Sequence, residues 1–130
     1  MVRKKVFMNR KKVRTVFLSL LVFLLIITPT LAASMSWNGN PGPSGLNSIE
    51  SLNVTSDRTI YLYNKINATG DYNAELRLLK DVWWGWETMS SVRQYQKELS
   101  MPYQVTKAVY KMHFRDYSGK FHNMNGKLYY

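Results

Sequence analysis

Three tryptophans fall within four residues of this chain and form its strongest chemical feature. Trp83, Trp84 and Trp86 surround Gly85 in a tight aromatic turn. Indole rings stack on sugars, fill pockets on protein partners and settle at membrane interfaces. Strand alternation places Trp84 and Trp86 on one side and Trp83 on the other, so we do not expect all three to be buried. We take Trp83, Trp84 and Trp86 as candidate binding residues; in the alternative interpretation, at least one of them fills the core.

The two histidines do not predict a metal site. His113 and His122 are the only histidines, and the chain has no cysteine and no carboxylate cluster to complete a ligand set. In the C-terminal hairpin described below, the two imidazoles point to opposite faces. We therefore expect no metal and no other cofactor, with His122 packed beside Phe114 near a turn and His113 at the surface.

The sequence shows no pattern typical of nucleophilic or acid–base catalysis. Ser90, Ser91 and Ser100 lack the Gly-X-Ser-X-Gly context of a nucleophile elbow, and no His–Asp partner can be assigned by spacing. Paired carboxylates are also missing from the sequence. The hypothesis is therefore a protein without enzymatic activity, although a small exported hydrolase is a third class that the pattern leaves open.

The N-terminal residues predict export. Seven Lys and Arg residues without an acidic residue lie between Arg3 and Arg14, and an apolar run follows over residues 16–27. With Ala32 or Ala33 as the residue before the cut, residues 1–33 read as a secretory signal peptide. The alternative is an uncleaved anchor over residues 16–33 that leaves the domain outside the cell. The exact cleavage site and the true start codon stay open.

The formal charge of +10 mostly reflects this leader. Residues 34–130 hold eleven basic and eight acidic side chains, which leaves +3. The basic residues are scattered singly along the sequence, and this pattern does not predict the basic face of a nucleic-acid-binding protein. We expect no nucleic-acid partner.

A Gly- and Pro-rich stretch follows the leader. Residues 34–46 include Trp-Asn-Gly-Asn-Pro-Gly-Pro-Ser from Trp37, and we predict a linker here because Gly and Pro at this density interrupt regular structure. Trp37 either packs back onto the domain or is exposed. Residues 47–130 are then long enough for one folded domain.

Alternating apolar residues predict strands through most of that domain. In residues 58–66 the apolar side chains Ile60, Leu62 and Ile66 share one face, and in residues 72–80 the residues Tyr72, Ala74, Leu76 and Leu78 do so. A short turn containing Gly70 separates the two runs, which predicts a hairpin. Residues 87–96 are ambiguous between a strand and a short helix, and we favour the strand.

The C-terminal residues predict a second hairpin. Ala108, Tyr110, Met112 and Phe114 alternate on one face, and Gly119 suits a turn that requires positive φ. This turn would pair Phe114 with His122, Met112 with Met124, and Ala108 with Leu128. Five to seven such strands indicate an all-β, small antiparallel β-sandwich of the Ig-like kind, preceded by the hydrophobic signal helix.

Several short motifs resemble those of small secreted, cysteine-free, Ig-like β-sandwich proteins of Gram-positive bacteria. They are Leu76-Arg-Leu-Leu-Lys80, Trp86-Glu-Thr-Met89, Thr106-Lys-Ala-Val-Tyr110 and Ser118-Gly119, within residues 51–130. The resemblance implies an Ig-like fold and an extracellular setting, with no assigned activity and no site residues to transfer. The tryptophan cluster is denser here than in that family, and residues 96–104 are shorter, which leaves the strand count open.

These observations favour a secreted, non-enzymatic binding module at or outside the cell surface. Its partner would be an extracellular protein, a glycan or a membrane surface, reached through Trp83, Trp84 and Trp86. The alternative is a secreted membrane-active, bacteriocin-like protein. The oligomeric state cannot be inferred from the sequence.

Overall fold

The computed structural model describes residues 32–130, and every regular element in this part of the chain is a β-strand. The strand interpretation of residues 87–96 is confirmed as far as Gln94, and the helix alternative is wrong. Within residues 32–130 we find no helix long and apolar enough to cross a membrane. The predicted signal helix and the alternative anchor fall almost entirely on residues 1–31, outside the described residues.

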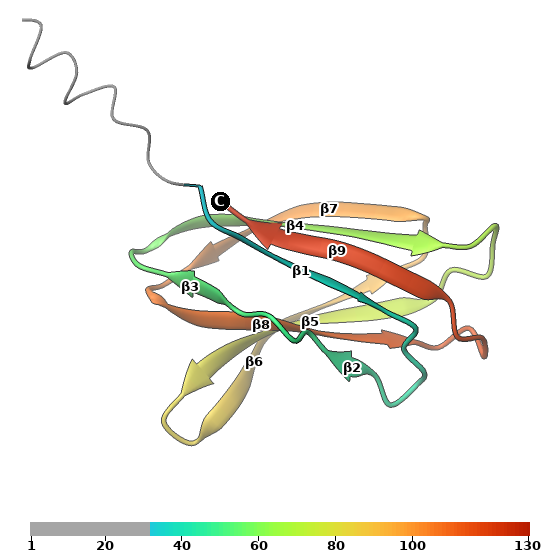
Figure 1. Cartoon of the computed structure of the whole chain (residues 1–130), viewed down its shortest axis with the longest axis horizontal. Helices are drawn as coiled ribbons and strands as arrows, with labels where there is room; N and C mark the ends of the chain where they lie inside the picture. The colour runs from blue at the N-terminus through green and yellow to red at the C-terminus, as the bar shows by residue number, and fades with distance from the viewer. Residues whose placement is uncertain (1–31) are drawn as a thin grey trace, which may run out of the picture. The chain divides into compact units, whose positions relative to one another are not determined.

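The strands form two antiparallel sheets that lie face to face (Figure 1). The first sheet, sheet A, has the order β1 (Ser34–Gly39), β9 (Asn123–Tyr129), β4 (Arg58–Asn67) and β7 (Glu98–Val105). Sheet B has the order β2 (Leu46–Asn47), β8 (Ala108–Asp116), β5 (Ala74–Val82) and β6 (Gly85–Gln94), and β3 (Leu52–Val54) also pairs with β8. The prediction of an all-β antiparallel sandwich is confirmed.

Alternation along each strand builds a single core between the sheets. The predicted inward faces of β4, β5, β8 and β9 are confirmed at the following buried positions: Ile60, Leu62, Ile66, Ala74, Leu76, Leu78, Tyr110, Met112, Phe114, Met124 and Leu128. Each fully buried large aliphatic or aromatic side chain contributes about 1.5–3 kcal/mol of transfer free energy. This core stabilises the domain without any disulfide, because the sequence holds no cysteine.

Both predicted hairpins are wrong in their pairing. β4 and β5 belong to different sheets, as do β8 and β9, so the predicted contact of Met112 with Met124 is not a cross-strand pair. The connecting loops, residues 68–73 and 117–122, instead carry the chain across from one sheet to the other. Alternation shows which face of a strand is buried, but it does not show which strand is its neighbour. Two strands with matching buried faces can pair within one sheet or face each other from two sheets.

These crossings give the strand order of a jelly roll. Among the strands of residues 32–130, only β5 and β6 are consecutive strands that pair with each other, and most other steps change sheet. In an immunoglobulin sandwich, several consecutive strands pair within one sheet. The Ig-like order is therefore a wrong expectation, and the order β1-β9-β4-β7 over β2-β8-β5-β6 is that of a double-sheet jelly roll.

The predicted linker over residues 34–46 begins instead with a strand of the sandwich. β1 pairs with β9 through six residues, and its Met35 and Trp37 side chains are buried. The indole of Trp37 lies over Gly126 on β9, where an added Cβ would overlap both the ring and the Tyr63 carbonyl. Only the second part of the stretch, residues 40–45, is a loop, and it holds both prolines and two of the three glycines.

A buried polar chain connects the two sheets through the core. Trp37 Nε1 donates to Asn64 Oδ1 at 3.0 Å, and Asn64 Nδ2 donates to Gln94 Oε1 at 2.8 Å. Trp37 and Asn64 belong to sheet A, whereas Gln94 ends β6 in sheet B. Because buried polar groups are costly without partners, this chain fixes the relative position of the sheets.

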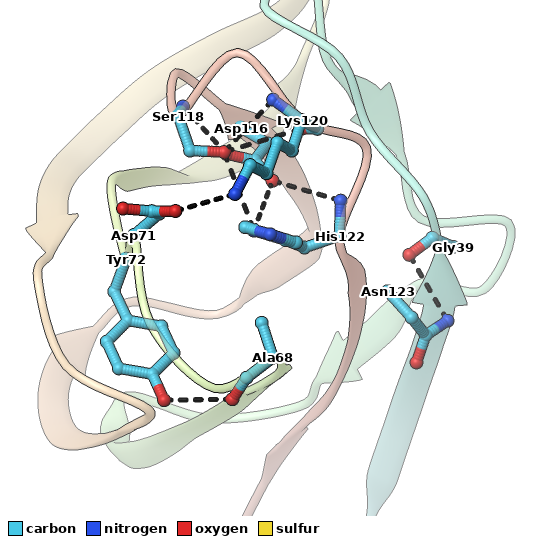
Figure 2. A network of polar contacts seen from close by, with 9 residues as sticks. All are labelled: Gly39, Ala68, Asp71, Tyr72, Asp116, Ser118, Lys120, His122 and Asn123. Carbon is cyan, nitrogen blue, oxygen red and sulfur yellow. Dashed lines mark hydrogen bonds and ion pairs between the residues drawn. The ribbon is translucent and has the colours of Figure 1, made fainter.

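The loop between β8 and β9 is organised by a buried carboxylate, as Figure 2 shows. Asp116 accepts hydrogen bonds from the backbone N–H groups of Ser118 and His122, at 2.9 and 3.2 Å. Lys120 Nζ lies 2.7 Å from Asp71 Oδ2 and so joins this loop to the one between β4 and β5. That ammonium lowers the pKa of Asp71. The two sheet-crossing loops therefore support each other.

Candidate functional site

The β5–β6 hairpin extends beyond its neighbour strand and carries the tryptophans at its tip. β5 pairs with β8 only as far as Lys80, whereas its pairing with β6 continues to Val82 and Gly85. Figure 1 shows the hairpin projecting from the body of the sheet. The turn needs glycine, since Gly85 has a φ of 130° that other residues rarely adopt.

All three candidate tryptophans are exposed on this hairpin. Trp83 is 91% exposed, Trp84 60% and Trp86 41%. The alternative in which one of them fills the core is therefore wrong. Trp83 and Trp84 meet edge to face, with ring centroids 5.1 Å apart, and the Lys111 ammonium lies 4.1 Å from the centroid of the Trp86 ring. These contacts orient the rings, and Trp83 and Trp84 keep most of their surface accessible.

A β-bulge separates the hairpin tip from the regular part of the sheet. The register of β5 and β6 shifts between Leu78 and Leu79, opposite the exposed Met89. Bulges increase the local twist and redirect the strand beyond them. Sequence alone does not indicate this bulge, since apolar alternation in β6 is weak on both sides of it.

Next to the hairpin, the outer surface of sheet B carries a group of basic side chains that sequence reasoning missed. Three cross-strand rows of β6, β5 and β8 define this cationic face: Arg93, Glu75 and Arg115; Ser91, Arg77 and His113; Thr88, Leu79 and Lys111. Along the sequence these basic residues are scattered singly. The register gathers them because residues far apart along the chain become cross-strand neighbours.

Three guanidinium groups surround one carboxylate on the cationic face. Glu75 Oε1 lies 2.6 Å from Arg77 Nε and 3.7 Å from Arg115 Nε, and Glu75 Oε2 lies 3.9 Å from Arg93 Nε. The carboxylate is nearly buried beneath the arginines. One negative charge thus holds three positive ones in place, and the excess charge faces solvent.

His113 belongs to the same face and is held as a neutral imidazole. Arg115 Nε donates to His113 Nε2 at 3.0 Å, so this ring nitrogen acts as an acceptor. The other nitrogen, Nδ1, lies 2.8 Å from Asn47 Oδ1 and donates to it. Burial lowers the pKa of His113, and the positive charges of Arg115 and Arg77 lower it further.

The two histidines lie in different parts of the domain. His113 lies on the outer face of sheet B, whereas His122 lies in the β8–β9 loop, where Nδ1 is 3.2 Å from Asp116 Oδ2. His122 is not paired with Phe114, whose partners are Leu46 and Leu76. Among residues 32–130, no group of three His, Cys, Asp or Glu side chains is placed to hold a metal ion.

A separate hollow of about 430 Å³ opens beside β1 and β2. Its walls include the apolar side chains of Trp37, Leu46 and Phe114. The Glu50 carboxylate lies at this hollow and accepts a hydrogen bond from the Ser36 backbone N–H at 2.9 Å. The size suits a small ligand, and Asn38 Oδ1, Asn47 Oδ1 and Ser48 Oγ already have partners within the chain.

Comparison with known proteins identifies the fold and no family. No family model matches the sequence, and no curated protein matches it. A solved structure of similar fold is the pre-peptidase C-terminal domain of collagenase from Bacillus anthracis, with a TM-score of 0.54 and 10% identity over 75% of this chain and 89% of that one. The Yersinia pseudotuberculosis-derived mitogen is similar at a TM-score of 0.45 and 15% identity, over 77% of this chain and 86% of that one. A further similar structure is described as CBM4, with a TM-score of 0.47 and 11% identity over 63% and 56% of the two chains.

Proposed function

We propose that this protein is an exported, non-enzymatic binding module whose contact surface is the β5–β6 hairpin. The observation that carries the proposal is the exposure of Trp83, Trp84 and Trp86 together at a projecting tip. Large aromatic side chains left in water at one place mark interaction sites, and tryptophan is the residue type most enriched among binding hot spots.

The tip of the hairpin is accessible, and its aromatic rings are already oriented. Beyond Lys80 its two strands pair only with each other, so the backbone of its tip pairs with no third strand of sheet B. The Trp83–Trp84 contact and the Lys111–Trp86 contact restrict the rings before any partner arrives. Restricting side chains in advance reduces the conformational entropy that binding must remove.

Export rests on the sequence of the leader. A basic segment, an apolar run and small residues at Ala32 and Ala33 are the parts of a signal peptide. Strand β1 begins at Ser34, directly after those alanines. The proposal predicts that the secreted product starts at Ala33 or Ser34, which mass spectrometry of the protein recovered from the medium can measure. An intact 130-residue product in the cytosol would contradict export.

Binding can be tested by comparing two variants of the exported protein. We expect Trp83→Ala/Trp84→Ala to lose binding on arrays of extracellular glycans and proteins. Tyr95→Ala, which removes an aromatic side chain that is 66% exposed outside the hairpin, should retain it. Equal binding by the wild type and the double variant, with both folded, would overturn the proposal.

Membrane activity is the second candidate function, because exposed tryptophans at a tip also suit a membrane interface. A membrane-active protein releases dye from anionic vesicles, whereas a binding module leaves them intact. We therefore expect no dye release at protein concentrations that saturate the array.

A further inference from the structure

The net charge of the described domain is concentrated on one surface. Four basic side chains and one acidic side chain lie in the three rows of the cationic face, which leaves +3 there: Arg77, Arg93, Lys111, Arg115 and Glu75. The other seven basic and seven acidic residues after Ser34 cancel. The whole excess of positive charge is thus found beside the tryptophan hairpin.

The cationic face and the tryptophans form one continuous strip along β5. Trp86 pairs with Asp81, two residues along β5 from Leu79 and its partner Lys111. The Lys111 ammonium contacts the Trp86 ring. From Glu75 to Asp81 the strand rises by about 20 Å, at roughly 3.3 Å per residue. The aromatic end of the strip also carries the exposed Asp81, and the three rows beyond it carry the net charge of +3.

From this arrangement we propose that the outer face of β8, β5 and β6 binds an anionic glycan, a sugar chain that carries carboxylate or phosphate groups. The proposal deepens the proposed function by naming the ligand class and rests on it. Sugar rings stack on the indoles, and guanidinium groups form paired hydrogen bonds with carboxylate or phosphate. A chain laid along β5 reaches both kinds of group.

The length of the strip favours a chain over a membrane surface. A bilayer that receives Trp83 at the tip would lie about 20 Å from the row of Arg93 and Arg115, by the strand rise. Charges in solution are screened over roughly 8 Å at physiological salt. Those arginines would therefore not contribute to membrane binding through the tip, whereas an extended polyanion contacts them directly.

The test measures the affinity of the exported protein for polygalacturonate by calorimetry, with neutral dextran as the uncharged comparison. Arg93→Gln/Lys111→Gln removes two charges of the cationic face and leaves Arg77 and Arg115 beside Glu75, so the carboxylate keeps its ion pairs. Lys97→Gln/Lys127→Gln removes the same charge from exposed positions elsewhere. We expect the first variant to bind at least tenfold more weakly and the second to bind within about twofold of wild type, with affinity falling as salt is raised.

Each remaining outcome separates this proposal from the proposed function. If Trp83→Ala/Trp84→Ala loses binding on the array but the two charge variants bind alike, the binding module stands and the anionic ligand is wrong. If the protein binds vesicles containing phosphatidylglycerol or a DNA duplex and not polygalacturonate, the ligand class is also wrong. If the wild type binds dextran and polygalacturonate equally, the charges have no role in recognition and the proposal fails.

Discussion

Trp37 on β1 and Trp83 at the tip of the β5–β6 hairpin occupy opposite environments in the same domain. Trp37 is 5% exposed, donates a hydrogen bond to Asn64 and lies over Gly126. Trp83 is 91% exposed, and its ring contact is with another exposed tryptophan, Trp84. From the sequence alone, both side chains could lie either in the core or at the surface.

The difference shows what determines whether a tryptophan side chain is buried in this fold. β1 pairs with β9 over its whole length, so its inward residues face the opposite sheet. The tip of the β5–β6 hairpin lies beyond the last residue of β5 that pairs with β8. Trp37 therefore contributes to stability through burial, whereas Trp83 contributes little to it, which supports a role for Trp83 in binding.

The largest expected effect is at Trp37. Trp37→Ala should lower the free energy of unfolding by about 3–5 kcal/mol, because it leaves a cavity between the sheets and removes the hydrogen bond to Asn64. Urea denaturation followed by circular dichroism measures this. A loss below about 1 kcal/mol would mean that β1 is dispensable, as the linker expectation for residues 34–46 would require.

A smaller loss is expected from the polar partner of Trp37. Asn64→Leu keeps an inward side chain but leaves Trp37 Nε1 and Gln94 Oε1 without their partner, which should cost about 2–3 kcal/mol of unfolding free energy. The double variant Trp37→Phe/Asn64→Leu should lose less than the two single losses added together. Additive losses would contradict the buried hydrogen-bonded chain.

Alternation in the sequence was sufficient for the strands and their buried faces, but not for their neighbours. Ile60, Leu62 and Ile66 are buried as predicted, because a period of two depends only on local geometry. Position 64 lies on the same inward face, yet nothing local indicates that its amide bonds to Trp37 and Gln94. Pairing depends on loops that cross between sheets, and a six-residue loop permits either a hairpin or a crossing.

The candidate site was predictable to the same extent. The tryptophan turn is a local cluster of residues, so its position in a hairpin could be inferred from the sequence. The cationic face could not, because Arg77, Arg93 and Arg115 meet only through the register of three strands. The +3 balance of residues 34–130 was visible, but its location on one surface was not.

The cationic face adds a pH-dependent contribution to stability that the hairpin tip lacks. His113 is neutral in the folded domain, with its pKa lowered by burial and by nearby charges. Above the ordinary histidine pKa of about 6.5, neither state binds the proton and stability is unaffected. As the pH falls below that value, the unfolded chain takes up a proton that the folded domain resists, so stability decreases.

We therefore expect the melting temperature of the wild type to fall between pH 7.5 and 5.5 by more than that of His113→Gln. Four charged groups surround the imidazole, and none of them is changed in this variant: Arg77, Lys111, Arg115 and Glu75. His122 is present in both proteins, so the difference between the two slopes isolates His113. Equal slopes would show that the Arg115–His113–Asn47 hydrogen bonds do not keep the ring neutral.

The smallest expected effect on stability is at the hairpin tip, and it makes the comparison decisive. Trp83→Ala should change the free energy of unfolding by no more than about 0.5 kcal/mol, because a side chain that is 91% exposed gives up little buried area. Urea denaturation measured beside Trp37→Ala checks this under the same conditions. A loss of 2 kcal/mol or more, taken as roughly the scale of a core truncation, would mean that Trp83 packs in the folded state. If stability is unchanged while binding is lost, Trp83 contributes to the free energy of binding and not to that of folding. Trp37 on β1 does the opposite.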